Sequence, residues 1–282
     1  MSDTHYILTL SCSDARGIVA AVSGFLTEHH GFIIESTQFG DPSTNRFFMR
    51  VHFAAPDGEG LRQAFQQNVA TPFAMDWHLA DASRKARVLV LVSRHMHCLN
   101  DLMYRHQTGQ LPVQIVAIAS NHDDARAMAE WHGIPYHHLP VTPDTKAQQE
   151  QQILDLVTRE AIDVVVLARY MQILSPELSA ALRGRAINIH HSFLPSFKGA
   201  KPYHQAYARG VKIIGATAHY VTDDLDEGPI IEQEVTRVDH AFSPEALTAV
   251  GQDIEALVLA RALKYHVERR VLLNGAKTVV FR

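Results

Sequence analysis

The first eighty residues alternate between β-type and helical hydrophobic patterns. The run YILTLS at 6–11 is largely apolar, and apolar residues recur with helical spacing from Ile18 to His29. Next come two β-rich runs, which are joined by the turn-forming sequence GDPSTN (40–45). They are followed by a weaker amphipathic helix and a closing strand. These four segments are Gly31–Phe39, Arg46–Phe53, Leu61–Val69 and Met75–Leu79. The order βαββαβ predicts a ferredoxin-like antiparallel sheet with both helices on one face.

The pattern changes after the polar and basic segment Asp81–Arg87. Short apolar runs then alternate with helical stretches, which predicts a Rossmann-like, mostly parallel sheet covered on both faces. The predicted strands are Val88–Val92, Val113–Ala119, Val164–Ala168, Ala186–Ile189, Ile213–Val221, Pro229–Val235 and Thr278–Phe281. The predicted helices are Leu99–His106, Asp123–His132, Gln148–Thr158 and Pro244–His266. We therefore predict an α/β chain with a first domain over 1–82, a linker over 83–87 and a second domain over 88–282.

Composition narrows the class of protein without identifying it. The chain has 282 residues, enough for two cores, and its net charge of -4 disfavours binding to nucleic acid or to an anionic membrane. No apolar run is long enough to span a membrane and the N-terminus lacks a signal-peptide pattern, so we predict a cytoplasmic protein. Cys12 and Cys98 form no motif, and the 18 histidines lack metal-ligand spacing, so neither a disulfide framework nor a metal site is predicted.

Two polar side chains stand at the end of a predicted buried strand. Asn188 and His190 alternate with apolar neighbours and therefore project on one side of the strand, where ligands of parallel sheets gather. An amide donor and an imidazole at this place can act on one small group. The pattern is equally consistent with an alternative interpretation. In it, Asn188 only forms a turn and His190 is a hydrogen-bonded core histidine.

The connection between the next two strands is acidic. Residues 223–227 contain four carboxylates, and the segment then enters the following strand through Gly228-Pro229. A rigid turn of this kind exposes backbone groups that can grip a heterocycle while one carboxylate faces the Asn188–His190 pair. A solvated turn would explain the same residues.

These two segments carry a family resemblance. INIHHSFLPSF (187–197) and HYVTDDLDEGPIIEQ (219–233) resemble the long signatures of formyltransferases that use 10-formyltetrahydrofolate, and the resemblance covers about residues 87–282. It implies a catalytic trio of Asn188, His190 and Asp226. It also implies substrate-binding residues in and near the acidic turn and in the segment 171–174. These are Met171, Ile173, Leu174, His219, Val221, Thr222, Asp223 and Leu225.

Within this family the chain resembles the formyltetrahydrofolate deformylases. SRHMHCLNDL (93–102) and FKGAKPYHQA (197–206) are similar to that branch, and the first of them lacks the glycines with which glycinamide ribonucleotide formyltransferases hold a phosphate. We expect Arg94, His95 and His97 to fill that space instead. For Lys198, Lys201 and Tyr203 two interpretations stay open, either solvated loop residues or residues that close over the site.

The N-terminal domain resembles an ACT domain, a module that often senses amino acids. The resemblance places an effector, glycine or methionine, at the first strand-to-helix turn, and it implies a homo-oligomer through pairing of ACT domains. The implied effector-binding residues are Asp14, Ala15, Arg16, Gly17 and Ile18.

The function implied is hydrolysis of 10-formyltetrahydrofolate to formate and tetrahydrofolate, which supplies formate for purine synthesis and balances the folate pool. No cofactor or metal is required, because folate is the substrate, Asn188 can donate to an oxyanion and His190 can exchange protons near neutral pH. Whether His190 or Asp226 takes the proton from water stays open. The alternatives are formyl transfer to a small amine and a non-catalytic amino-acid sensor.

Overall fold

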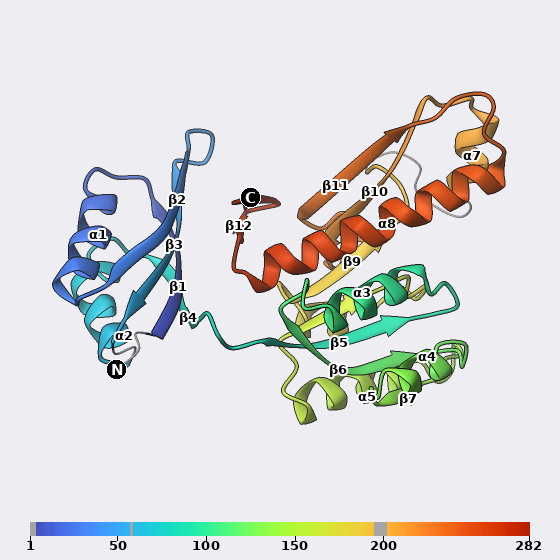
Figure 1. Cartoon of the computed structure of the whole chain (residues 1–282), viewed down its shortest axis with the longest axis horizontal. Coiled ribbons are helices and arrows are strands. Elements are labelled where there is room, and N and C mark those ends of the chain that lie inside the picture. The colour runs from blue at the N-terminus through green and yellow to red at the C-terminus, as the bar shows by residue number, and fades with distance from the viewer. Residues whose placement is uncertain (1–3, 57–58, 195–201) are drawn as a thin grey trace. The chain divides into compact units, whose positions relative to one another are not determined.

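The computed structural model describes residues 4–56, 59–194 and 202–282 (Figure 1). The chain folds into two compact units. The first ends at Lys85 and also takes in Glu268–Arg282, and the second is Ala86–Val267. In the described part of the chain, no helix has both the length and the apolar composition needed to cross a membrane.

The first unit is a four-stranded antiparallel sheet with the strand order β2-β3-β1-β4. Its elements are β1 (Thr4–Ser13), α1 (Ile18–Glu28), β2 (Phe32–Asp41), β3 (Arg46–Ala55), α2 (Glu59–Phe65), a π-helical turn (Gln66–Ala70) and β4 (Asp76–Asp81). Leu8 of β1 lies opposite Val51 and Leu79, and this strand packs against Val22 and Phe25 of α1. The predicted βαββαβ order is confirmed. The predicted helix over 61–69 ends at Phe65, and the π-helical turn follows it.

The last residues of the chain belong to this first unit. β12 (Val271–Asn274) and β13 (Lys277–Val280) form an antiparallel hairpin. Arg270 Nη1 donates to Glu35 Oε1 (3.1 Å), and Asn274 Nδ2 donates to Asp41 Oδ2 (2.7 Å). The buried Arg50 of β3 donates through Nε to the carbonyl oxygen of Glu268 (3.1 Å). The predicted second domain, 88–282, is therefore too long at its C-terminal end, because polar side chains of β2 and β3 bind the final hairpin.

The second unit contains a seven-stranded sheet with the order β11-β10-β9-β8-β5-β6-β7. The strands from β5 to β9 pair in parallel, whereas β10 pairs antiparallel to both β9 and β11, so the predicted mostly parallel sheet is confirmed. Its strands are β5 (Ala86–Val92), β6 (Val113–Ser120), β7 (Tyr136–His138), β8 (Val164–Leu167), β9 (Ala186–His190), β10 (Ile213–Tyr220) and β11 (Ile230–Arg237). Its helices are α3 (His97–Gln107), α4 (Arg126–Trp131), α5 (Lys146–Arg159), α6 (Pro176–Ala181), α7 (Pro202–Ala208) and α8 (Pro244–Val267).

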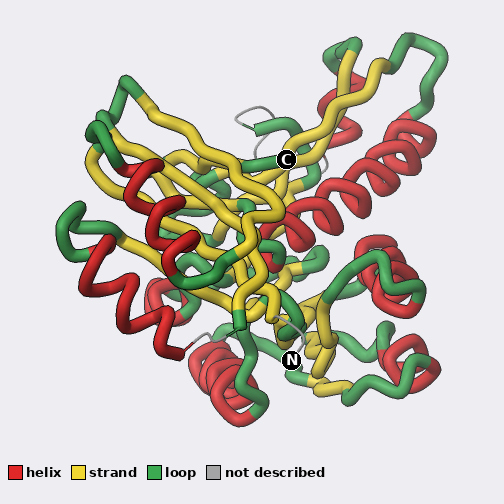
Figure 2. Tube along the Cα trace, turned by 60° about the vertical axis from the view of Figure 1, so that its left-hand side comes forward, coloured by secondary structure: helices red, strands yellow, loops and turns green. Residues whose placement is uncertain are grey.

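Helices cover both faces of this sheet. Leu89 and Leu91 of β5 share one core with Ile153 of α5 and Leu178 of α6. The alternate residues of β5, such as Val90, are also fully buried, because the other face is covered too. The long helix α8 packs along β10 and β11 and against α3 (Figures 1 and 2).

Three short elements of this unit have no counterpart in the sequence prediction: β7, α6 and α7. The start of α6 carried a readable signal. Ser175 accepts a hydrogen bond from the backbone N–H of Leu178 (3.2 Å), and Pro176 follows directly as the first helical residue. Serine before proline at this place is a typical helix start.

The sheet positions the site near the place where the order of its parallel strands reverses. β6 and β8 lie on opposite sides of β5, and in such sheets ligands bind beyond the carboxyl ends of the strands at this switch point. Ser93, directly after β5, is hydrogen-bonded to the chain segment that follows β8. Its backbone N–H donates to the carbonyl oxygen of Arg169 (3.3 Å), and its Oγ accepts from the backbone N–H of Met171 (3.1 Å).

Candidate active site

His190 and Asp226, two members of the predicted trio, lie in contact. His190 ends β9, Asp226 lies in the connection between β10 and β11, and Nδ1 of the histidine is 3.1 Å from Oδ2 of the aspartate. Both side chains are largely buried. Asp226 has a φ of 58°, in the left-handed region, and a side chain at Gly228 would collide with the carbonyl oxygen of Tyr220. The tight turn through Gly228 therefore brings the carboxylate back to the end of β9.

Asp226 is ionised at neutral pH. Burial alone would raise the pKa of its carboxyl group, but hydrogen bonds and charges from His190 and His219 outweigh burial and lower the pKa well below its ordinary value. Nε2 of His219 lies 3.6 Å from the second carboxylate oxygen of Asp226. The carboxylate is thus held between two imidazoles.

His219 also positions Asn188. The two residues are opposite each other across β9 and β10, and Asn188 Nδ2 lies 3.3 Å from His219 Nε2. The other ring nitrogen, Nδ1, is 2.9 Å from the carbonyl oxygen of Tyr220, which can only accept, so Nδ1 carries the proton. Nε2 faces both Asn188 and Asp226: with a proton it donates to the carboxylate, and without one it accepts from the Asn188 amide, which leaves the second amide hydrogen for a ligand.

His190 presents an unused nitrogen. Its Nδ1 donates to Asp226, whereas its Nε2 is buried and has no hydrogen-bond partner among the described residues. Buried polar atoms are nearly always paired, so an unpaired ring nitrogen beside a cavity indicates a place for a ligand.

The trio opens onto a cavity of about 240 Å³ at the carboxyl ends of β8 and β9. All of the predicted substrate-binding residues line it: Met171, Ile173, Leu174, His219, Val221, Thr222, Asp223 and Leu225. Met171, Ile173 and Leu225 expose large apolar surfaces there. Asp223 turns outward and lies 3.8 Å from Arg183, so the acidic turn contributes mainly its backbone and Asp226 to the cavity.

Comparisons with known proteins agree with this geometry. The sequence pattern described as formyl transferase matches residues 86–263, which is more than half of the chain. The chain belongs to the formyl transferase family. A formyltetrahydrofolate deformylase from Corynebacterium sp. (strain P-1) is 52% identical over 282 residues, covering 99% of this chain and 98% of the relative.

Solved structures extend the family likeness to the fold. The crystal structure of a formyltetrahydrofolate deformylase from Burkholderia mallei matches with a TM-score of 0.95 and 56% identity over 99% of this chain and 100% of that one. Glycinamide ribonucleotide transformylase 1 from Symbiobacterium toebii matches with a TM-score of 0.66 and 26% identity, covering 70% of this chain and 95% of that one. The deformylase structure is therefore similar along the whole chain, whereas the transformylase structure matches only part of it.

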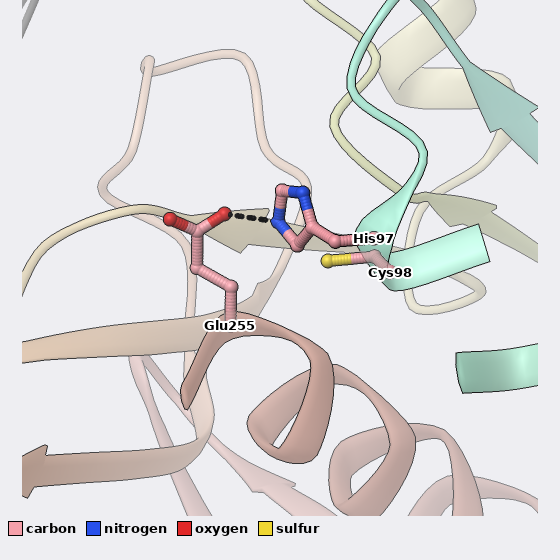
Figure 3. Close-up of side chains that lie close together, drawn as sticks. All are labelled: His97, Cys98 and Glu255. Carbon is pink, nitrogen blue, oxygen red and sulfur yellow. Dashed lines mark hydrogen bonds and ion pairs between the residues drawn. The ribbon is translucent and has the colours of Figure 1, made fainter. Parts of the chain in front are cut away.

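A second polar cluster of this formyl transferase fold was missed by sequence reasoning. Glu255 of α8 is 1% exposed, and its Oε2 lies 2.8 Å from His97 Nε2 (Figure 3) and 3.4 Å from Arg169 Nη1. Tyr203 donates to Oε1 (2.6 Å). Burial alone would raise the pKa of Glu255, but the hydrogen bond from His97 and the charge of Arg169 lower it, so the carboxylate is ionised. The signal in the sequence was a glutamate on the apolar face of α8, one turn after the buried Gly251.

The same cluster contains potential metal ligands. In the described part of the chain, His97, Cys98 and Glu255 are the group whose potential ligand atoms lie close enough together, all within 4.8 Å. Burial and the charge of Glu255 raise the pKa of the Cys98 thiol well above its usual range, so it is protonated, and Arg169 already supplies a cation to Glu255. These properties fit a hydrogen-bonded ion cluster better than a metal site.

The loop after β5 differs from expectation. Arg94 and His95 are exposed, and only His97 of the three turns inward, to Glu255. The expectation that all three fill a phosphate space is therefore wrong, because the helix α3 begins at His97 and directs this side chain alone towards α8. Tyr203 is buried rather than solvated, while Lys198 and Lys201 lie outside the described residues.

The predicted effector segment lies in the first unit. Asp14, Ala15, Arg16 and Gly17 are exposed, whereas the Ile18 side chain is buried in the core, so Ile18 can offer a ligand only its backbone. Gly17 has a φ of 93° and precedes α1, and Asp14 lies close to Gly40 of β2. The exposed turn at the start of a helix is a geometry suited to a carboxylate.

Proposed function

We propose that this formyl transferase family member hydrolyses 10-formyltetrahydrofolate to tetrahydrofolate and formate. Deformylase relatives that match it along its whole length support the reaction. The observation that carries the mechanism is the buried pair His190–Asp226, with Nε2 of His190 left for a ligand. The cavity beside this pair is lined by apolar side chains and by exposed backbone of the acidic turn, which suits a flat heterocycle.

The reaction breaks the bond between N10 and the formyl carbon and forms a bond from that carbon to a water oxygen. One hydrogen of the water ends on N10, and the other is released when formic acid ionises to formate. His190 is the better base of the two candidates, because Asp226 is engaged by two histidines and its lowered pKa makes it a weak base. His190 Nε2 takes a proton from the water, and Asp226 stabilises the resulting imidazolium.

Asn188 completes the arrangement. While His219 holds one of its amide hydrogens, the other donates to the oxyanion that develops on the formyl oxygen, an interaction worth about 3–4 kcal/mol when preorganised. His190 then returns its proton to N10 as the amine leaves. His191, beside His190, stays neutral at this stage, because burial and the charge of Arg169 lower its pKa to about 4. The proposed mechanism uses side chains alone, without a cofactor or metal.

A product assay tests this function. The purified chain is incubated with 10-formyltetrahydrofolate alone, and formate and tetrahydrofolate are measured. Hydrolysis should proceed at full rate without any amine, and added glycinamide ribonucleotide should change neither product. Formylated ribonucleotide formed at a rate comparable to formate would support the alternative, a formyltransferase acting on a small amine.

We further propose that a small amino acid, glycine or methionine, binds at Asp14–Ile18 and regulates turnover. The exposed turn with left-handed Gly17 before α1 supports this site. Calorimetry with each amino acid should give saturable heat that Gly17→Val removes. No heat with any amino acid, and kinetics unaltered by them, would count against it.

We also propose how the chain assembles and in which compartment it acts. We expect a homo-oligomer formed through the first unit, measurable by sedimentation equilibrium. We place the protein in the cytoplasm, apart from nucleic acids and membranes, which its net negative charge supports. Both cysteines are free and buried, as suits a reducing compartment.

A further inference from the structure

Arg169 is a buried cation at the edge of the catalytic cavity. It follows β8 by two residues and lines the cavity together with His190 and His191. Its side chain is 10% exposed, and its Nε and Nη1 atoms have no hydrogen-bond acceptor among the described residues. Every N–H of a guanidinium is a donor, so this side chain carries unused hydrogen-bonding capacity in a buried place.

Glu255 forms an ion pair with Arg169 but does not accept a hydrogen bond from it. Its Oε2 lies 3.4 Å from Arg169 Nη1, which is an ion pair but not a hydrogen bond, because His97 and Tyr203 already donate to the two carboxylate oxygens. A side chain at Gly251 would collide with the Tyr203 ring, so glycine at this place lets Tyr203 reach Glu255. The carboxylate is thus shared among three groups, and the guanidinium receives only its charge.

The backbone at Arg169 is strained. Its φ of 63° lies in the left-handed region, which disfavours a long side chain, and its carbonyl oxygen is fixed by the backbone N–H of Ser93. Strained residues of this kind concentrate at functional sites. Here the strain keeps a charged side chain beside the reacting groups.

The other ionisable groups near Arg169 are neutral or already have hydrogen-bond partners. His191 is neutral at pH 7 because burial, Arg169 and His190 lower its pKa to about 4. Asp226 is paired with His190 and His219, and Glu255 accepts hydrogen bonds from His97 and Tyr203 besides its ion pair with Arg169. Arg169 is therefore the group on this wall that combines a fixed positive charge with N–H donors lacking an acceptor.

We propose that Arg169 forms a subsite for a small carboxylate, namely the formate that hydrolysis releases. This inference rests on the proposed function and names the residue that receives the second product. A carboxylate supplies the acceptors that the guanidinium lacks, and hydrogen bonds between two charged groups are the strong ones. The water that attacks the formyl carbon is activated at His190, which lines the same cavity as Arg169, so the carboxylate forms in the cavity that contains this cation.

Binding of formate without folate tests the subsite directly. ¹³C-labelled sodium formate is titrated with the full chain, and line broadening of the formate signal is measured against sodium chloride at equal ionic strength. Arg169→Gly, which relieves the backbone, and Arg169→Gln should each weaken binding by about tenfold to a hundredfold, the loss expected for a charged hydrogen bond. Arg169→Lys should bind with intermediate affinity.

The matched control is Arg105→Gln, which removes an equally charged side chain paired with Asp101 on α3, outside the cavity. It should bind formate as the parent chain does. Formate bound equally well by Arg169→Gly and by the parent chain would overturn the subsite, as would parent-chain binding no better than that of chloride. Thermal unfolding of each variant verifies that it is folded.

The kinetic readout separates this inference from the proposed function. Formate should inhibit hydrolysis by the parent chain, and its inhibition constant should rise by a similar factor in Arg169→Gln. If formate binds through Arg169 while 10-formyltetrahydrofolate is not hydrolysed, the subsite stands and the proposed function fails. If hydrolysis proceeds and formate binding is independent of Arg169, the proposed function stands and the subsite fails.

Discussion

At the scale of single residues, the position of Asp226 between two imidazoles decides which group acts as a base. His190 and His219 stabilise the carboxylate, so its pKa falls and its affinity for a proton is low. In the proposed mechanism the proton from water therefore passes to His190, whose Nε2 has no hydrogen-bond partner among the described residues. The same carboxylate also keeps the imidazole of His190 in the orientation and tautomer that this role needs.

Asp226→Asn tests this arrangement. The substitution keeps the size of the side chain but removes the charge that stabilises the imidazolium, so turnover should fall by about 10²–10⁴ while the KM for folate changes little. Steady-state kinetics measure both quantities. Asp224→Asn, in the same turn but exposed, is the matched control and should keep its turnover. Equal turnover in the two variants would falsify the role of Asp226.

At the scale of secondary-structure elements, the connection from β10 to β11 determines where Asp226 lies. The backbone N–H of Tyr220 donates to the carbonyl oxygen of Pro229 (2.9 Å), and Gly228 packs directly against the carbonyl oxygen of Tyr220. The close approach excludes any side chain at position 228. The conformation of the connection between β10 and β11 therefore depends on Gly228 as much as on the carboxylates.

Gly228→Ala should lower both stability and turnover. The added methyl group must displace the backbone of β10, at a cost of about 2 kcal/mol in the free energy of unfolding, and it moves Asp226 away from His190. Urea unfolding and kinetics measure the two effects. Gly24→Ala makes the same chemical change in α1, where nothing lies near, and should instead raise stability by about 0.5–1 kcal/mol.

The helix α8 contributes a pH-dependent part of the stability through Glu255. The folded-state pKa of Glu255 lies below its ordinary value of 4.5, so the carboxylate stabilises the fold above about pH 4.5, and this contribution is lost as pH falls through the lowered pKa. At pH 7 Glu255→Gln should lower the free energy of unfolding by about 3 kcal/mol, because Arg169 loses its buried partner.

This loss of stability is measured by denaturant unfolding of Glu255→Gln and of the parent chain at pH 7 and pH 4. The difference between the two proteins should be smaller at the lower pH. Asp253→Asn, on the exposed side of the same helix, should change stability by less than about 0.5 kcal/mol at either pH. A difference that grows on acidification would contradict an ionised Glu255.

At the scale of the whole molecule, the chain leaves its first unit after Lys85 and returns to it at Glu268. The returning hairpin is held by Arg270, which donates to Glu35 and Glu268, and by Asn274, which donates to Asp41. The second unit is therefore an insertion between two parts of the first unit in the order of the sequence. The proposed catalytic residues all lie inside the inserted segment.

Arg270→Ala should loosen the hairpin and leave catalysis intact. Loss of the charged hydrogen bonds to Glu35 should speed amide hydrogen exchange in β12 and β13 by about tenfold, while turnover stays within about twofold of the parent value. Exchange is measured by mass spectrometry of peptides. Lys277→Ala, exposed in the same hairpin, should leave exchange unchanged. A large loss of turnover would mean that the hairpin serves the active site.

The sequence by itself determined the main helices and strands and the two segments that hold the proposed catalytic residues. Periodicity reveals helices such as α1 and α5, because burial of one helix face forces apolar residues into a fixed spacing. β5 is recognised instead as a short continuous apolar run, because both of its faces are buried. Asn188, His190 and the turn with Asp226 could be found because they occupy two continuous segments whose residues resemble family signatures.

Only the tertiary structure decided which distant residues meet. Glu255 binds His97, 158 positions away, and Asn274 binds Asp41, 233 positions away. No local spacing encodes such pairs, because they follow from the order of strands in the sheets and from the path of the chain between them. For the same reason the fold, and not the sequence pattern, brought Arg169 to the cavity wall and placed the final hairpin on the first unit.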